Sequence, residues 1–232
     1  MIHCSLILVL GMHRSGTSCL AGSLQQAGLE LGDVFTANPF NAKGNREHRT
    51  VMELNDAVLA HSGGAWNDPP AQLSWSRWHA RRRDRFLREL HAAADGRPLG
   101  FKDPRALLTL PFWQDAGISI RAVGTYRNPL AVARSLESRN RMALADGLAL
   151  WQAYNERLLA LHEEEPFPLV SFDAEEQAYL DRLGAVIQQL GLDESAETFF
   201  EAGLRRASAE DHEEESLPRE IRELHGRLCA LT

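Results

Sequence analysis

The segment from Gly11 to Ser18 carries the residues whose types and spacing are best suited to binding a phosphate-like group. Its sequence, GMHRSGTS, has the length of the phosphate-binding loop pattern G-x-x-x-x-G-K-[ST], but Thr17 stands where that pattern has lysine. Gly11 and Gly16 permit tight turns and a close approach of the backbone to a ligand. The segment is therefore a candidate anion site that lacks the lysine used to bind triphosphates.

The context of this loop is the one that a phosphate site requires. An apolar run from Leu6 to Leu10 precedes it, and apolar residues recur at helical spacing after it. Backbone amides at the start of the following helix would point toward an anion, and nearby side chains add a charge and hydroxyl donors. The residues expected to bind the anion are Arg14, Ser15, Gly16, Thr17 and Ser18.

Strand and helix patterns alternate along the chain and predict an α/β protein. The expected strands are Leu6 to Leu10, Arg97 to Lys102, Ile118 to Tyr126 and Phe167 to Phe172. The main helical patterns between and after them are Pro129 to Ser138, Leu144 to Leu161 and a segment carrying Leu180 to Leu190. This order predicts a three-layer phosphate-loop fold, with a central parallel sheet flanked by helices on both faces.

Polar residues follow every expected strand. They are the loop from Gly11, then Lys102-Asp103, Arg127-Asn128 and Asp173. Ligands of such sheets bind at the carboxyl ends of the strands, so these residues are expected to meet. Asp103-Pro104 is expected to begin a helix, and Asp173 with Glu176 resembles a capping box.

Composition narrows the class of protein. The 232 residues are 44% hydrophobic and 25% charged, which fits one globular domain over residues 1–232. The net charge of −7 argues against a general nucleic-acid binder. Three separated cysteines indicate reduced thiols, and the N-terminal apolar run is too short to span a membrane. We therefore expect a cytoplasmic protein, with its oligomeric state left open.

Some segments depart from the alternating pattern. Asn38 to Arg49 and Gly63 to Pro70 are rich in turn residues and are expected to be loops over one edge of the sheet. Arg77 to Leu90 is expected to be a helix whose six arginines form a solvated face, with a patch for an acidic acceptor as the alternative. Glu210 to Glu215 is expected to be a solvated loop.

Three motifs together resemble the sulfotransferases that use 3′-phosphoadenosine 5′-phosphosulfate (PAPS). GMHRSGTS resembles the loop that binds the 5′-phosphosulfate, and YRNPLAVARSL resembles the 3′-phosphate segment, with Ser135 eight residues after Arg127. FKDPR, which contains Lys102, resembles the Lys-Asp-Pro segment of the tyrosylprotein branch. Residues from about 35 to 90 are similar to the acceptor-side insertion of bacterial carbohydrate-type members. The resemblance covers Leu6 to Leu192.

The resemblance implies the substrates and the binding residues. PAPS would be the sulfuryl donor and 3′,5′-adenosine bisphosphate the product, without a metal. Arg14 and Ser15 to Ser18 would bind the 5′-phosphosulfate, and Arg127 with Ser135 would bind the 3′-phosphate. The acceptor would be a hydroxyl or an amine, with a glycan or a small-molecule hydroxyl as the expected class and a glycolipid or a peptide tyrosine as open alternatives. Asn67-Asp68, beside Trp66, could contact a sugar or could simply order the loop.

The same resemblance suggests catalytic roles. Lys102 and Arg14 would stabilise the charge that develops during transfer. Cytosolic members place a basic His two residues after the lysine, but Pro104 occupies that position. Glu47 is the expected general base, His48 is its rival and Asp103 is a third candidate.

The resemblance also has gaps. Phe172 would pack against the adenine in place of the usual Tyr, and His212 to Arg219 is a candidate to complete the 3′-phosphate site. Two other functions stay open. One is a non-catalytic module that binds PAPS or another anion; the other is an ATP-using phosphate-loop kinase, which Thr17 disfavours.

Overall fold

A computed structural model of the chain describes residues 5–37, 44–193, 195, 199–200 and 217–232. Its strands are β1 (Ser5–Leu10), β2 (Leu99–Lys102), β3 (Ser119–Tyr126) and β4 (Leu169–Ser171). Its helices are α1 (Thr17–Gln26), α2 (Arg49–His61), α3 (Arg77–Ala94), α4 (Ala106–Gln114), α5 (Pro129–Asn140), α6 (Leu144–Glu164), α7 (Glu176–Leu190) and α9 (Arg219–Cys229).

The strands form one parallel sheet in the order β2-β1-β3-β4. β1 lies inside the sheet, where Val9 is in register with Lys102 of β2 and with Val123 of β3. Parallel strands in such a position are covered on both faces, which explains why β1 is an uninterrupted apolar run. All four expected strands are confirmed, with ends that differ by at most two residues.

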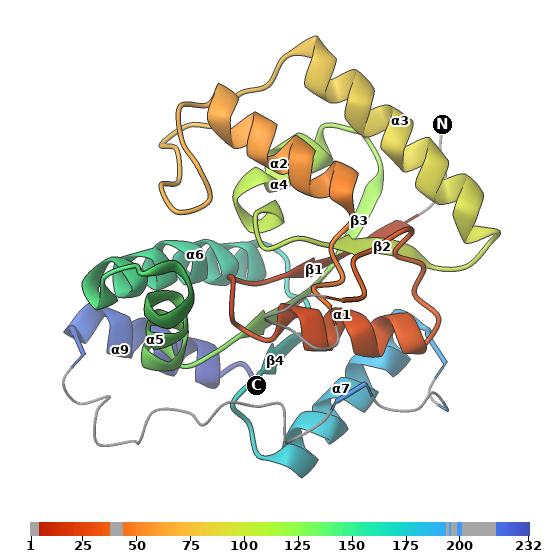
Figure 1. Cartoon of the computed structure of the whole chain (residues 1–232). Helices are drawn as coiled ribbons and strands as arrows, with labels where there is room; N and C mark the ends of the chain where they lie inside the picture. Colours follow the sequence, from red (N-terminus) through yellow and green to blue (C-terminus); the bar gives the residue numbers. More distant parts are fainter. Residues whose placement is uncertain (1–4, 38–43, 194, 196–198, 201–216) are drawn as a thin grey trace.

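Helices cover both faces of the sheet, as the sequence predicts (Figure 1). Alternate residues of β1 point to opposite faces. Ile7 and Val9 belong to the apolar cluster that α1 and α7 complete. Leu6, Leu8 and Leu10 belong to a larger cluster with α2, α3, α4, α6 and α9. The three-layer α/β architecture is thus confirmed.

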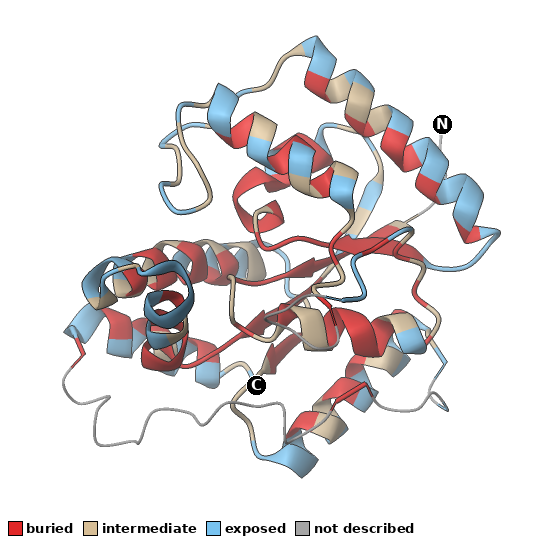
Figure 2. Cartoon of the chain, in the orientation of Figure 1, coloured by how far each residue is buried: buried red, intermediate tan, exposed pale blue. Residues whose placement is uncertain are grey.

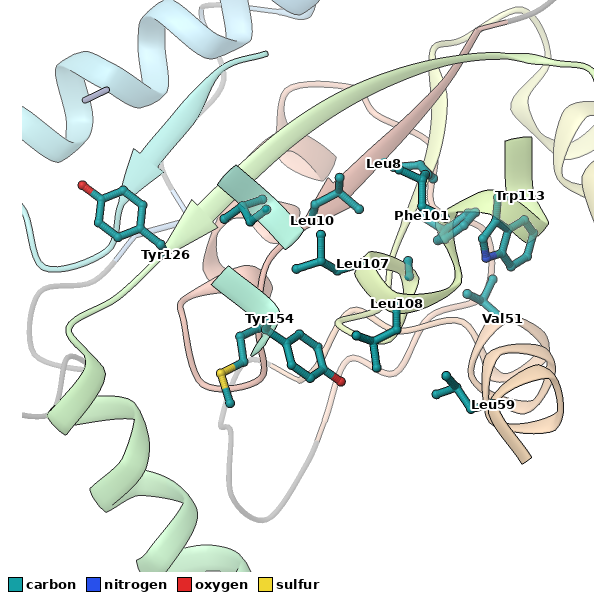
Figure 3. Close-up of a cluster of buried hydrophobic side chains, with 14 of the residues drawn as sticks. Leu8, Leu10, Val51, Leu59, Phe101, Leu107, Leu108, Trp113, Tyr126 and Tyr154 are labelled. Carbon is teal, nitrogen blue, oxygen red and sulfur yellow. The ribbon is translucent and has the colours of Figure 1, made fainter. Parts of the chain in front are cut away.

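The larger cluster contains the bulkiest side chains of the protein. Figure 2 shows the sheet and the helix surfaces that face it as buried, and Figure 3 shows part of this cluster. The rings of Phe101 and Trp113 pack with centroids 4.5 Å apart, and both residues are almost fully buried. This packing fixes the end of β2 against α4, and so fixes the position of Lys102 in the sheet.

Two expected helix starts differ in the structure. α4 begins at Ala106, because Pro104 and Arg105 form a turn before it. The capping box expected from Asp173 and Glu176 is wrong, since Glu175 is the N-cap of α7 and accepts hydrogen bonds from the amides of Gln177 and Ala178. Asp173 is used elsewhere, at the end of β3.

The basic helix also differs from the expectation in one residue. α3 is formed as predicted, but Arg83 is only 3% exposed and so is not part of a solvated face. Its guanidinium donates to the backbone oxygen of Phe112 and lies 3.0 Å from Oδ2 of Asp115. Arg83 therefore attaches α3 to α4, a role that charge periodicity alone does not distinguish from solvation.

α2 and α9 have no counterparts among the predicted helices. α9 packs on α6 and places Ile221, Leu224 and Leu228 in the larger cluster. The predicted loop Glu210 to Glu215 lies outside the described residues, as do residues 38–43 of the first turn-rich segment.

Candidate functional site

The candidate site lies at the carboxyl edge of the sheet, where the four strands end. The loop from Gly11 follows β1, Lys102 is the last residue of β2, and Arg127 follows β3. Ser171 at the end of β4 is in register with Tyr126 at the end of β3. The sheet therefore brings together the polar residues that the sequence places after its strands.

The loop between β1 and α1 has a backbone that depends on its glycines. Gly16 has a φ of 83°, and a Cβ there would lie 2.2 Å from the ring of Phe172. Gly11 has a φ of 146°, and a Cβ there would lie 2.4 Å from the backbone oxygen of Thr125. The hydroxyl of Thr125 also donates to the backbone oxygen of Ser15 at 2.9 Å. Neighbouring strands thus hold the loop in one shape.

This shape suits an anion. The amides of Thr17 and Ser18 come before the first backbone hydrogen bonds of α1, in which Cys19 and Leu20 donate to the oxygen of Gly16, so these two amides can donate to a ligand. The hydroxyl oxygen of Ser15 is buried and has no hydrogen-bond partner among the described residues. Arg14 has a φ of 69°, a left-handed conformation that is uncommon for a residue with a side chain. Unused donors beside a cation fit a phosphate or sulfate group.

Lys102 lies at the centre of a buried polar cluster. Its Nζ lies 2.6 Å from Oε1 of Glu47, 3.0 Å from the backbone oxygen of Asn45 and 3.3 Å from the hydroxyl of Ser18. Lys102 is 2% exposed and Glu47 is 7% exposed. The hydroxyl of Ser18 also donates to the oxygen of Asn45 at 3.1 Å. The cluster therefore connects the loop, the end of β2 and the segment before α2.

An extended segment before α2 places Glu47 in this cluster. The amide of Phe35 donates to the oxygen of Glu47, and the amide of Arg46 donates back to the oxygen of Phe35. Glu47 and His48 are consecutive in an extended strand-like segment, so their side chains point in different directions. This is why only one of the two rival bases meets Lys102.

His48 has a different environment. Its Nδ1 accepts a hydrogen bond from the amide of Thr50 at 3.1 Å, so its side chain caps α2. Its ring lies 4.8 Å from that of Phe86 of α3. Burial lowers the pKa of His48, and the nearby carboxylates of Asp33 and Glu89 oppose that effect. The structure thus brings His48 to α3, and it brings Glu47 to Lys102.

Asp103 forms its own buried ion pair. Nη1 of Arg105 lies 3.1 Å from both carboxylate oxygens of Asp103, and the amide of Arg105 donates to Oδ1 at 2.8 Å. Arg105 also pairs with Asp56 of α2 at 2.6 Å. Burial raises the pKa of Asp103 to about 6, although the charge of Arg105 opposes it. Both oxygens of Asp103 are thus held by Arg105.

The expected 3′-phosphate residues contact different partners. Nε of Arg14 donates to the hydroxyl of Ser135 at 2.8 Å, which joins the loop to α5. Nε of Arg127 donates to Oδ1 of Asp173 at 3.1 Å, and its guanidinium lies 5.3 Å from the centre of the Phe172 ring. Ser135 thus contacts Arg14 of the loop, whereas Arg127 contacts Phe172 and Asp173, which follow β4. His212 to Arg219 lies largely in residues that the structure does not describe.

Asp173, which follows β4, binds the residues that follow β3. Its Oδ2 accepts from the amide of Asn128 at 2.6 Å, and the side chain of Asn128 caps α5 by accepting from the amide of Ala131. The backbone oxygen of Arg127 accepts from the indole of Trp151 at 2.8 Å. Three partners therefore fix the backbone of Arg127-Asn128 and the start of α5.

His13 is a site residue that the sequence reading does not single out. Its ring lies 4.6 Å from the ring of Trp66 and 6.0 Å from that of Tyr154. The hydroxyl of Tyr154 donates to the backbone oxygen of Trp66, which fixes the Gly63 to Pro70 loop beside the phosphate loop. A histidine inside a polar loop has no periodicity of its own, so only its place in the loop could have drawn attention to it.

A cavity of about 580 Å³ opens beside Trp66. Residues of the Gly63 to Pro70 loop line one side, and the end of α5, the turn after it and the first half of α6 line the other. Its lining includes Trp66, Asn67, Pro69, Arg141, Met142 and Asp146. This volume lies within the range of small-ligand pockets.

The described residues contain no group of three or more His, Cys, Asp or Glu side chains arranged to hold a metal ion. None of their helices combines the length and the apolar character needed to cross a membrane.

Comparisons with known proteins identify the fold. No family model matches the chain, and no curated protein matches it. The sulfotransferase domain from the Synechococcus PCC 7002 olefin synthase has a TM-score of 0.54 and 19% sequence identity, over 99% of this chain and 89% of that chain. The chain therefore has the fold of a sulfotransferase domain, and the fold implied by its motifs is confirmed.

Two other solved structures are less similar. The sulfotransferase domain from the curacin biosynthetic pathway has a TM-score of 0.47 and 13% identity, over 99% of this chain and 92% of that one. Sulfotransferase STF1 from Mycobacterium tuberculosis H37Rv has a TM-score of 0.48 and 14% identity, over 97% and 71% of the two chains.

Proposed function

We propose that this chain, which has the fold of a sulfotransferase domain, transfers a sulfuryl group from PAPS to a hydroxyl or amine acceptor. The observation that carries the proposal is the cluster of Lys102 with Glu47 and Ser18. It places a cation and a carboxylate against the loop that fits an anion. A sulfuryl transfer needs both, one for the developing charge and one for the acceptor proton.

The donor would bind along the phosphate loop. Its 5′-phosphosulfate would accept hydrogen bonds from the amides at the start of α1 and from the hydroxyls of Ser15, Thr17 and Ser18. The positive charge of Arg14 would pair with it. Its 3′-phosphate would be bound by the side chains of Arg127 and Ser135. The buried hydroxyl of Ser15, which has no partner among the described residues, supports this fit. The chemistry needs no lysine in the loop, because Lys102 supplies that cation from β2.

Glu47 is the proposed general base. Lys102 holds one of its carboxylate oxygens, which leaves the other available to a ligand. During transfer the acceptor oxygen forms a bond to sulfur, its proton passes to Glu47, and the S–O bond to the 5′-phosphate breaks. The bond electrons leave with the bridging oxygen on 3′,5′-adenosine bisphosphate. Lys102 and Arg14 would stabilise the negative charge at the sulfuryl group and at this leaving phosphate.

The acceptor would lie against residues 35 to 90, the proposed acceptor-side insertion. Both Glu47 and Trp66 belong to this segment, and the cavity beside Trp66 is large enough for a small hydroxyl compound or one sugar unit. A glycan or a small-molecule hydroxyl is the class that we propose. A cytoplasmic location and a single domain over residues 1–232 complete this proposal.

An acceptor screen tests the proposed function. The chain is incubated with PAPS carrying radiolabelled sulfur and with sets of sugars, phenols and aliphatic alcohols, and labelled products are counted. We expect transfer to at least one set without added metal and its loss in Glu47→Gln. Tight bisphosphate binding with no transfer to any set would instead support the non-catalytic binding module.

A further inference from the structure

The cavity beside Trp66 is lined by two charged residues that the proposed function does not use. Among the described residues that line it, Arg141 carries a positive charge and Asp146 carries a negative charge. The two do not pair with each other, and neither side chain has a hydrogen-bond or ion-pair partner among the described residues. Both charges are therefore available to a ligand in the cavity.

The backbone of Arg141 has a conformation that is more usual for glycine. Its φ is 57°, in the left-handed region, and it is the C-cap of α5, where its amide donates to the oxygen of Glu137. Helices that end in this conformation most often have glycine there, because a Cβ makes it unfavourable. Residues in such sparsely populated conformations concentrate at ligand sites. This strain at a cavity wall indicates that the side chain of Arg141 has a function.

The facing wall of the cavity is a tight turn. The amide of Ala65 donates to the oxygen of Asp68 at 2.8 Å, and the amide of Asp68 donates back to the oxygen of Ala65 at 3.2 Å. Trp66 and Asn67 form the tip of this turn, and both line the cavity. The hydroxyl of Tyr154 holds the turn by donating to the oxygen of Trp66 at 2.8 Å. The wall that carries the aromatic ring is thus in place before a ligand binds.

The wall that carries Arg141 is also held in place. A Cβ at Gly147 of α6 would lie 3.1 Å from Cα of Ala133 of α5, so the two helices approach each other closely. Met142, in the short turn between them, and Leu150 of α6 also line the cavity. Two fixed walls therefore offer an aromatic ring, apolar side chains and one cation to the same ligand.

The cavity adjoins the phosphate loop through Trp66. The ring of Trp66 lies 4.6 Å from the ring of His13, the residue before Arg14 in the loop. An acceptor that packs on the indole would therefore lie next to the loop that is proposed to hold the donor. A second contact, to Arg141, would fix the orientation of the acceptor relative to that loop.

We propose that Arg141 binds a carboxylate of the acceptor, and hence that the acceptor is a hydroxylated compound that carries a carboxylate group. The proposal rests on the proposed function, which places the acceptor in this cavity. The planar guanidinium would donate to both carboxylate oxygens, and the body of the acceptor would pack on Trp66. Glu47 keeps its proposed role as the base for the acceptor hydroxyl.

The charges of the cavity favour a carboxylate over a phosphate group. A carboxylate carries a single charge, which one guanidinium matches, whereas a phosphate carries about −1.5 to −2 charges at pH 7. Asp146 lines the same cavity and would repel the additional charge. Its carboxylate can instead accept a hydrogen bond from a hydroxyl of the acceptor.

Calorimetric titration with matched pairs of compounds tests this proposal. The chain is saturated with 3′,5′-adenosine bisphosphate and titrated at pH 7 with 4-hydroxyphenylacetate or its amide, and with glucuronic acid or its amide. Each amide has the shape of its acid without the charge. We expect the acid of at least one pair to bind at least about tenfold more tightly than its amide. Equal affinities in both pairs, or no binding of any of the four compounds, would overturn the proposal.

Substitutions at Arg141 show whether this residue causes the preference. Arg141→Gln and Arg141→Gly should both reduce the affinity for the acid to that for the amide, without changing the affinity for the amide. Asp146→Asn should strengthen binding of the acid, because it removes the repelling charge. Equal weakening of acid and amide in the Arg141 variants would refute the contact.

Unfolding in urea separates this role from a structural one. Arg141→Gly relieves the left-handed backbone, so the variant should be at least as stable as the unchanged chain. Asp95→Gly is the matched control, because Asp95 has a φ of 49° at the end of α3 and does not line the cavity. It should keep both the stability and the preference for the acid. A marked loss of stability in Arg141→Gly would show that the arginine supports the turn, and would overturn the proposal.

The outcomes also separate this proposal from the proposed function. If the acceptor screen finds transfer but the acids have no advantage, the role of Arg141 is refuted while sulfuryl transfer stands. If the acids bind through Arg141 but no compound is sulfated, the proposed function fails while the carboxylate site stands.

Discussion

Nζ of Lys102 lies 2.6 Å from Oε1 of Glu47, and both side chains are buried at the edge of the sheet where the strands end. The two residues are far apart in the chain, and the sequence gives no sign that they pair. Their contact joins the end of β2 to the segment before α2. It also fixes the cation and the carboxylate on which the proposed reaction depends.

The first prediction concerns the stability that this pair provides. Lys102→Met leaves the carboxylate of Glu47 buried without its partner, and such a loss costs about 3–5 kcal/mol. The double variant Lys102→Met/Glu47→Gln removes both charges and should recover much of that free energy of unfolding, as measured by urea denaturation. Additive losses in the double variant would show that the two charges do not interact.

The second prediction separates the rival bases. Glu47→Gln keeps the shape of the side chain but removes the basic oxygen, so kcat should fall by about a hundredfold or more. His48→Asn keeps a side chain that can cap α2 and should leave kcat near normal. Turnover of both variants is measured at saturating PAPS. Normal turnover of Glu47→Gln together with a large loss in His48→Asn would move the role to the histidine.

The third prediction concerns the 3′-phosphate. Arg127→Ala removes a contact that would exist in both the ground state and the transition state, so the KM for PAPS should rise more than kcat falls. Arg121→Ala is a control on β3, the strand that Arg127 follows, and the guanidinium of Arg121 contacts backbone oxygens at the end of α7. Steady-state kinetics should show the effect for Arg127 alone. An equal change in kcat and kcat/KM for Arg127→Ala would contradict this assignment.

The fourth prediction follows from the buried carboxyl of Asp103. Burial raises the pKa of Asp103 to about 6 in the folded protein, above the usual value of about 3.9 for an aspartate, so the folded state binds more protons between these values. The free energy of unfolding should therefore fall as the pH rises from about 4 to about 6, by at most about 2–3 kcal/mol from this group.

Asp103→Asn should remove that part of the pH dependence, measured by denaturant unfolding at a series of pH values. Asp56→Asn is the control, because Asp56 pairs with the same Arg105 but is about half exposed. If the free energy of unfolding of Asp103→Asn changes with pH as steeply as that of the unchanged protein, the carboxyl of Asp103 does not titrate in this range.

The sequence predicts the sheet and the loop well because both depend on local patterns. The apolar run of β1 and the glycines at positions 11 and 16 specify a buried strand and a turn without reference to distant residues. Polar residues at the strand ends predict where a site will form, because parallel strands end at one edge.

The sequence does not predict which of these residues pair. Glu47 and His48 have the same expected role, and the direction of each side chain depends on the bridge between residues 34 and 48. Asp173 has the pattern of a helix cap, but it binds Arg127 because β3 and β4 are neighbours. Arg83 has the pattern of a solvated face until α4 packs beside it. These contacts are made between segments distant in the chain, which local patterns do not encode.

The central claim is that the loop binds a donor with separate 5′- and 3′-charges and no metal. The most direct measurement is calorimetric titration of the chain with 3′,5′-adenosine bisphosphate, in the presence of a chelator, compared with adenosine 5′-monophosphate and with ATP–magnesium. The bisphosphate should bind at least about tenfold more tightly than either, because only it engages both phosphate sites at once. Binding of ATP–magnesium as tight as that of the bisphosphate, or tighter, would contradict the account.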